Sequence, residues 1–182
     1  MQTFAVYVDN KPGVLNRVAS LFRRRAFNIE SLTVGHTETA GLSRMTIVVD
    51  TDERGARLVE ANLYKLIPVR RVDNITRIPT IGRDLAMIKV AATGDARTQV
   101  MQLVDVYRAR IVDVSPESLV IETTGTEDKI DSLLEVLRPY GVIEMVRTGR
   151  VEMARGIMQP TPTATQPAAL RAQMQDVSGG SV

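Results

Sequence analysis

The order of hydrophobic patterns along the chain restricts the possible folds most strongly. Residues that alternate apolar and polar indicate strands, and apolar residues spaced three or four apart indicate helices. Along the first half they occur in the order strand, helix, strand, strand, helix, strand, over residues 3–9, 14–26, 28–34, 42–50, 54–66 and 69–78. This order predicts the split β-α-β, or ferredoxin-like, α+β unit. Right-handed crossovers place the first and third strands centrally, and these two strands are the most apolar.

The second half of the chain repeats this pattern, though not the residues themselves. Strands are predicted over residues 84–92, 110–114, 119–123 and 142–146. Two helical stripes lie between them, formed by Val100, Leu103, Val104 and Tyr107 and by Ile130, Leu133, Leu134 and Leu137. We therefore expect two ferredoxin-like βαββαβ domains in tandem, residues 1–78 and 84–157, joined by a linker over residues 79–83. The last part, 158–182, is rich in Pro, Thr, Ala and Gln, which predicts a disordered tail.

The composition of the chain argues against several classes of site and partner. The 182 residues include no Cys and one His, so a thiolate metal site, a Cys nucleophile and a disulfide framework are excluded. A net charge of +2 argues against a nucleic-acid partner, and RNA-binding sheets of this topology carry a Lys/Arg-Gly-Phe-type motif that is missing here. No apolar run approaches the roughly 20 residues of a membrane span, and the first residues do not resemble a signal peptide. We expect a cytoplasmic protein without a membrane partner.

The turn over Asp9–Leu15 is the first candidate binding site. A strand that leads into a helix N-terminus presents unpaired N–H groups and the positive end of the helix dipole, which together bind carboxylates. Gly13 allows close approach to the backbone, and the Asn10 amide offers both a donor and an acceptor. An ordinary helix start explains the same residues, with an Asn cap and Pro12 at the first helical position, and from the residues alone it is the commoner case.

Asn28, at the start of the second strand, is a candidate for the other half of such a site. It is separated from Gly13 by the full length of a helix, so the two residues can meet only across an interface between two chains. The second strand is a predicted sheet edge, and the unpaired N–H and C=O groups of an edge strand can pair with a strand of another chain. Pairing two such edges about a two-fold axis brings Asn28 of one chain towards the turn of the other. A simple turn residue at a helix-to-strand junction is the alternative.

The remaining polar groups form no catalytic constellation. His36 stands alone, which argues against a metal site. The run Arg23–Arg25 suits the C-terminal end of a helix. The acidic residues Asp50, Asp52 and Glu53 fit a solvated loop better than a reactive pair.

Six segments together resemble the regulatory (small) subunit of acetohydroxyacid synthase, also called acetolactate synthase. They are DNKPGVLNRV (9–18), FNIESLTV (27–34), LSRMTIVV (42–49), LYKLIPVRRV (63–72), IVDVSP (111–116) and TGRVEMARG (148–156). The likeness extends over about residues 1–157. The first half is similar to the ACT domain of that family, a ferredoxin-like module that binds amino acids, and the second half to its C-terminal domain.

The resemblance implies a non-catalytic regulatory subunit that stimulates a catalytic large subunit and confers feedback inhibition by valine in branched-chain amino acid biosynthesis. It implies a homodimer through the ACT domain, with valine bound at the interface by Asn10, Gly13, Val14 and Leu15 of one chain and Asn28 and Ile29 of the other. No cofactor is expected in this chain. Thiamine diphosphate, Mg²⁺ and FAD are expected on the catalytic partner.

Three other functions remain to be distinguished. One is a free-standing ACT sensor that acts on another enzyme or regulator, although no DNA-reading motif is present. A second is a ferredoxin-like RNA-binding protein, and a third is an enzyme in its own right. Acetolactate production by the purified chain alone would favour the third.

Overall fold

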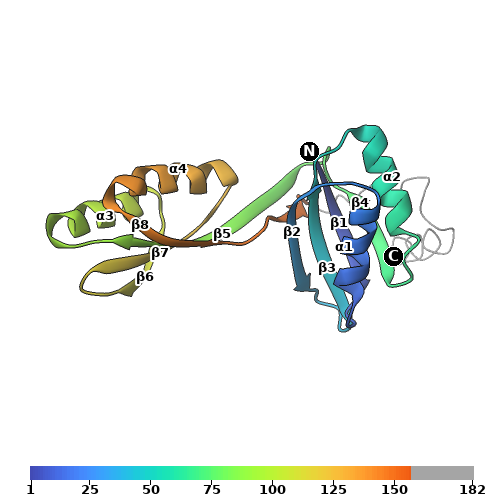
Figure 1. The fold of residues 1–182 in the computed structure, drawn as a ribbon, viewed down its shortest axis with the longest axis horizontal. Coiled ribbons are helices and arrows are strands. Elements are labelled where there is room, and N and C mark those ends of the chain that lie inside the picture. Colours follow the sequence, from blue (N-terminus) through green and yellow to red (C-terminus); the bar gives the residue numbers. More distant parts are fainter. Residues whose placement is uncertain (157–182) are drawn as a thin grey trace, which may run out of the picture. The chain divides into compact units, whose positions relative to one another are not determined.

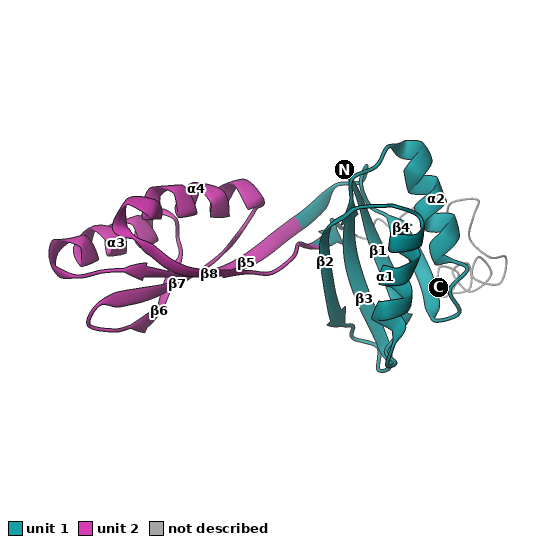
Figure 2. Ribbon diagram, viewed as in Figure 1, with its two compact units in different colours: residues 1–81, 152–182 teal, residues 82–151 magenta. Residues whose placement is uncertain are grey.

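The computed structural model describes residues 1–156, which form two α+β units (Figure 1). The first unit comprises residues 1–81 and 152–156, and the second comprises residues 82–151 (Figure 2). The predicted tail, residues 158–182, lies outside the described residues, as does the last residue of the predicted second domain.

The first unit has the predicted element order. Its elements are β1 (Gln2–Asp9), α1 (Val14–Arg24), β2 (Ile29–His36), β3 (Leu42–Val49), α2 (Glu53–Leu63) and β4 (Val69–Asn74). The antiparallel sheet has the order β2-β3-β1-β4, which confirms β1 and β3 as the central strands. One apolar core joins the sheet to α1 and α2, and its largest fully buried side chains are Phe4, Phe22, Met45, Ile47 and Leu63.

The second unit repeats this topology. Its elements are β5 (Thr80–Ala91), which begins in the first unit, α3 (Gly94–Val106), β6 (Arg110–Val114), β7 (Ser118–Gly125), α4 (Glu127–Leu137), the short 3₁₀ helix η1 (Arg138–Tyr140) and β8 (Val142–Arg147). Strand β9 (Val151–Ala154) starts at the last residue of this unit and continues into the first unit. The order β6-β7-β5-β8 again places the first and third strands of the unit in the centre. Two tandem ferredoxin-like units are therefore confirmed. The core has its own members, including Ile88, Leu119, Ile121, Leu133 and Leu137.

Two strand boundaries and one additional strand differ notably from the prediction. The strand predicted to reach residue 78 ends at Asn74, because the Asn74 Oδ1 accepts hydrogen bonds from the Thr76 N–H and hydroxyl at 3.0 and 2.6 Å and so closes a local turn. Strand β5 begins at Thr80, so it includes most of the predicted linker. Strand β9, which pairs with β5, was not predicted.

Helix α1 ends in a Schellman motif. The Phe27 N–H donates to the Phe22 carbonyl at 3.1 Å and the Ala26 N–H to the Arg23 carbonyl at 3.2 Å, while Ala26 has a positive φ of 55°. The Phe22 and Phe27 rings meet edge to face, with centroids 6.4 Å apart. This apolar contact fixes the direction in which the chain leaves the helix, and so the position of Asn28.

Ala26→Gly is expected to stabilise the protein by about 0.5–1 kcal/mol. Glycine removes the steric strain of the left-handed conformation, which is about 1–2 kcal/mol. Glycine also raises the conformational entropy of the unfolded chain, and this cancels part of the gain. The free energy of unfolding in urea tests this. The matched control is Ala19→Gly in the middle of α1, which should destabilise by about 1 kcal/mol. Equal losses in both variants would contradict the assignment of strain to Ala26.

Candidate functional site

Backbone hydrogen bonds to two other loops hold the turn between β1 and α1. The Asp9 N–H donates to the Pro68 carbonyl at 2.8 Å, and the Asn10 N–H donates to the Gly41 carbonyl at 2.8 Å. Both acceptors lie just before strands that neighbour β1, namely β4 and β3. The sheet therefore fixes the turn from both sides.

The helix starts differently from the ordinary start considered above. Helix α1 begins at Val14, the N-cap is Gly13 with φ 81°, and no side chain caps the helix. The expectations of an Asn cap and of Pro12 at the first helical position are therefore wrong. Glycine adopts this left-handed conformation without the steric cost that a Cβ would bring.

The helix N-terminus consequently has open backbone donors. The first regular helical hydrogen bond runs from the Arg17 N–H to the Gly13 carbonyl at 3.1 Å, and the Val14 N–H reaches the Lys11 carbonyl only at 3.4 Å. Within residues 1–156, the N–H groups of Gly13, Leu15 and Asn16 donate to no acceptor. A Cβ added at Gly13 would meet nothing within 4 Å, so the space beside these donors is open.

Side-chain exposure divides the predicted residues of this turn. Asn10, Gly13 and Leu15 are exposed, with Leu15 at 46%, whereas Val14 is buried in the core of the first unit. Val14 can therefore offer a ligand only its backbone, and Leu15 is the apolar side chain on the surface. The Asn10 amide nitrogen lies 3.4 Å from His36 Nδ1 at the end of β2.

Charges around the turn favour an anion. Arg70 Nε and Nη2 donate to the two carboxylate oxygens of Asp9 at 2.5 and 3.0 Å, and Lys11 Nζ lies 3.3 Å from the same carboxylate. The hydrogen bond from Arg70 holds the pKa of Asp9 below its ordinary value, and Asp9 raises the pKa of Arg70. Two cations thus surround one carboxylate, which leaves a net positive charge beside the helix N-terminus.

The second group of predicted residues lies after the Schellman motif. Asn28 is exposed, and its amide nitrogen donates to the Glu30 carboxylate. The amide oxygen of Asn28 accepts no hydrogen bond among residues 1–156, so it remains an available acceptor. Ile29 is partly buried against the core, and its register partner on β3 is Val49.

One chain does not bring these two groups together. Ile29 pairs with Val49 at one end of β3, whereas Asp9, beside the turn, pairs with Leu42 at the other end. The 11-residue helix α1 between them is about 16 Å long at 1.5 Å per residue. The structure therefore keeps these two groups of predicted residues apart within one chain.

Strand β2 is an edge of the four-stranded sheet. Its only strand partner within the described part of the chain is β3, so its outer side is open to another strand. Val34 on this strand is 44% exposed and pairs with Met45 of β3. An edge strand of eight residues whose outer side is unpaired is suited to pairing with a second chain.

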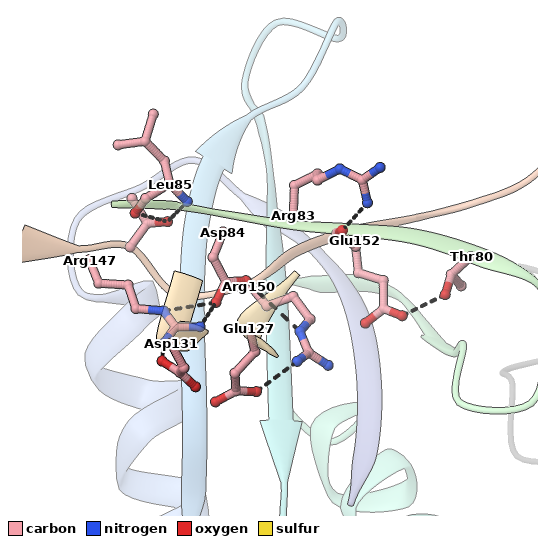
Figure 3. Close-up of polar contacts among 11 residues, drawn as sticks. Thr80, Arg83, Asp84, Leu85, Glu127, Asp131, Arg147, Arg150 and Glu152 are labelled. Atoms are coloured by element: carbon pink, nitrogen blue, oxygen red, sulfur yellow. Dashed lines mark hydrogen bonds and ion pairs between the residues drawn. The ribbon is translucent and has the colours of Figure 1, made fainter. Parts of the chain in front are cut away.

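The sequence analysis missed a cluster of ion pairs in the second unit (Figure 3). The Asp84 carboxylate is 8% exposed and accepts hydrogen bonds from Arg147 Nη2 and Nε at 2.7 and 3.1 Å. Arg147 also binds Asp131 at 2.9 Å, and Arg150 binds Glu127 at 3.0 Å. The cluster ties β5 and the end of β8 to α4, so its role is to hold the second unit together.

Arg147→Met is expected to destabilise the protein by about 2–4 kcal/mol, because it leaves the buried Asp84 carboxylate with Arg150 at 4.0 Å as its remaining counter-charge. Thermal and urea unfolding measure the loss. Arg110→Met, which removes an exposed arginine of the same unit, is the control and should change stability by less than about 0.5 kcal/mol. A similar small change in both variants would show that the cluster contributes little.

Other candidates from the sequence take structural roles. Asp52 is the N-cap of α2 and accepts a hydrogen bond from the Gly55 N–H at 2.7 Å, which is a structural use of one acidic residue in the predicted loop cluster. Arg23 and Arg24 form the last turn of α1. Over residues 1–156 no group of three or more His, Cys, Asp or Glu side chains is placed to hold a metal ion. Among the described helices, none is long and apolar enough to cross a membrane.

Comparisons with known protein families agree on both units. The family model "AHAS small subunit-like ACT domain" matches residues 4–71, and the model "Small subunit of acetolactate synthase" matches residues 83–156. The probable acetolactate synthase small subunit of Archaeoglobus fulgidus is 52% identical over 154 residues, which cover 85% of this chain and 96% of that protein. The acetolactate synthase small subunit of Mycolicibacterium smegmatis is 47% identical over 154 residues, 85% and 91% of the two chains.

A solved structure gives the same result. The crystal structure of the acetolactate synthase small subunit from Thermotoga maritima superimposes with a TM-score of 0.82 at 40% sequence identity. The match covers 86% of this chain and 98% of that chain. This chain therefore belongs to the family of acetolactate synthase small, or regulatory, subunits, with an ACT domain in its first unit.

Proposed function

We propose that this chain binds the catalytic large subunit of acetolactate synthase, stimulates it, and confers feedback inhibition by valine in branched-chain amino acid biosynthesis. The observation that carries this proposal is the turn between β1 and α1. It combines unpaired helix N–H groups, an exposed Asn10 and a net positive charge within an ACT domain of this family.

The chemistry of the turn fits an α-amino acid. The ligand carboxylate lies on the N–H groups at Gly13 to Leu15, where the helix dipole and the open donors favour an anion. The ammonium group meets the amide oxygens of Asn10 and Asn28. The isopropyl group of valine lies against the exposed side of Leu15 and the partly buried Ile29. Burial of that group contributes about 1.5–3 kcal/mol.

The site closes only when two chains pair. The β2 edges of two chains associate about a two-fold axis, and Asn28 and Ile29 of each chain then approach the turn of the other. An isologous dimer of this kind contains two equivalent sites. Because each site spans both chains, valine binding alters the geometry of the dimer, and a coupling free energy of about 1–3 kcal/mol is enough to inhibit the partner enzyme.

The catalytic chemistry belongs to the partner. In this proposal thiamine diphosphate, Mg²⁺ and FAD are bound by the large subunit, and this chain supplies no catalytic group and works in the cytoplasm without a nucleic-acid or membrane partner. Its contributions are stimulation and the response to the end product.

Reconstitution tests the proposal. The purified chain is mixed with its large subunit, and acetolactate formation is measured for the chain alone, the large subunit alone and the mixture, with and without valine. We expect no product from the chain alone, higher activity in the mixture than in the large subunit alone, and inhibition by valine only in the mixture. A mixture with the activity of the large subunit alone would contradict the proposal and favour a free-standing amino-acid sensor.

A further inference from the structure

A row of aromatic and cationic side chains crosses the face of the first sheet that neither α1 nor α2 covers. Arg44 on β3, Tyr7 on β1 and Arg71 on β4 are register partners. The two guanidinium groups lie over the Tyr7 ring, at 5.8 Å for Arg44 and 5.0 Å for Arg71. Burial lowers the pKa of Arg71, but the hydrogen bond to Asp73 together with the charges of Asp73, Tyr7 and Tyr64 outweighs this, so the net pKa is raised.

Arg44 also holds the segment that returns from the second unit. Its Nη2 donates to the main-chain carbonyl of Glu152, and its Nη1 donates to the Thr46 hydroxyl at 3.0 Å. The Thr80 hydroxyl donates to Glu152 Oε1 at 2.6 Å (Figure 3). Glu152 is therefore attached to the first unit through both its backbone and its side chain.

The place of Glu152 in the chain gives this contact its importance. The chain passes into the second unit after Ile81 and re-enters the first unit at Glu152. Arg44 thus binds the first residue of the return crossing. The same strand, β3, also starts beside the candidate site, because the Gly41 carbonyl just before it accepts the hydrogen bond from the Asn10 N–H. A short segment of β3 therefore connects the turn with the return crossing.

The attachment is incomplete. Glu152 Oε2 is buried and accepts no hydrogen bond among residues 1–156. A buried carboxylate oxygen without a donor lowers the stability of the state that contains it, and it would gain water if the segment were released. The contacts of Arg44 and Thr80 thus stabilise the attached state, whereas the unpaired Glu152 oxygen destabilises it. Such a balance suits an element with two states of similar free energy.

We propose that Arg44 is a positioning residue that latches β9 to the ACT domain, and that effector binding at the β1–α1 turn acts on the second unit through this latch. The inference rests on the proposed function for its effector. Valine bound at the turn shifts the start of β3, and Arg44 transmits that shift to Glu152. Losing Arg44 uncouples the response to valine from the binding of valine.

Hydrogen exchange on the full-length protein tests the latch without any ligand. In Arg44→Met, the backbone amides of residues 151–155 should exchange about tenfold or more faster than in the unmodified protein, while those of α1 keep their protection. Arg57→Met, which removes an exposed arginine from α2, is the matched control and should leave both regions unchanged. Thr80→Val, which removes only the hydroxyl donor, should accelerate the same amides by a smaller factor. Unchanged exchange of residues 151–155 in both Arg44→Met and Thr80→Val would overturn the latch.

Two further measurements separate the latch from the proposed function. Calorimetry of the isolated chain measures valine binding, and the reconstituted complex measures inhibition. Arg44→Met should bind valine with unchanged affinity, but saturating valine should inhibit its complex far less than it inhibits the unmodified complex. Inhibition of the Arg44→Met complex to the unmodified extent would overturn its coupling role. Absence of valine binding by the unmodified chain would overturn the proposed effector, and the exchange comparison would still decide whether the latch exists.

Discussion

Asn28→Ala should leave a dimer that still stimulates the catalytic subunit but needs much more valine for inhibition. The substitution removes the amide oxygen that accepts from the ligand ammonium in the proposed site. A hydrogen bond to a charged group contributes about 1.5–3 kcal/mol, which corresponds to about 10–100-fold in valine concentration for half inhibition. Inhibition curves of the reconstituted complex measure this shift.

The fold should tolerate this change. Asn28 is exposed, and its contact in the single chain is with the exposed Glu30, so the stability should change by less than about 0.5 kcal/mol. Gln102→Ala, which removes an exposed amide from α3 in the other unit, is the control and should leave the inhibition curve in place. Undiminished inhibition of the Asn28→Ala complex would show that this residue is not part of the effector site.

Val34→Lys should weaken the dimer and, with it, valine binding. A lysine on an edge strand opposes pairing with a second strand, because its ammonium would have to be buried or its side chain displaced at the interface. We expect the dimer dissociation constant to rise by about 30-fold or more, as for loss of an interface hot spot. Light scattering over a range of protein concentrations measures the mass, and calorimetry on the same samples measures valine binding.

The control for this charge is Leu58→Lys on α2. Leu58 is 51% exposed, close to the 44% of Val34, but it lies on a helix rather than on the sheet edge. This variant should remain a dimer and bind valine. A Val34→Lys protein that is monomeric but binds valine with full affinity would contradict a site shared between two chains.

The sequence predicted the architecture because the apolar spacing of both halves follows the periods of strands and helices. The start of α1 at Val14 was predicted correctly, but its cap was not. The Asn10 N–H donates to the carbonyl of Gly41, which is distant in sequence, and the N-cap is Gly13 in a left-handed conformation. Neither the long-range hydrogen bond nor the backbone angle leaves a signal in local spacing. The separation of Asn28 from the turn could be predicted, because helix length alone sets it.

Two other features could not be read from the sequence. Strand β9 is short, and its apolar residues Val151 and Met153 are 50% and 66% exposed, so it shows no buried face. The alternation of apolar and other residues was the only sign of this strand in the sequence. The pair of Asp84 and Arg147 joins residues 63 positions apart, and charged residues at the ends of strands are usually solvated.

The most direct test of the shared site combines two weakened variants. Asn10→Ala and Asn28→Ala chains each lack one amide of every site, so both homodimers should bind valine at least about tenfold more weakly than the unmodified dimer. A heterodimer of the two restores one complete site, because one chain retains Asn10 and the other retains Asn28. After co-refolding of equal amounts, half of the dimers are mixed, and calorimetry should find about a quarter of the normal number of sites at normal affinity. No binding at normal affinity by the refolded mixture would contradict a pocket built from two chains.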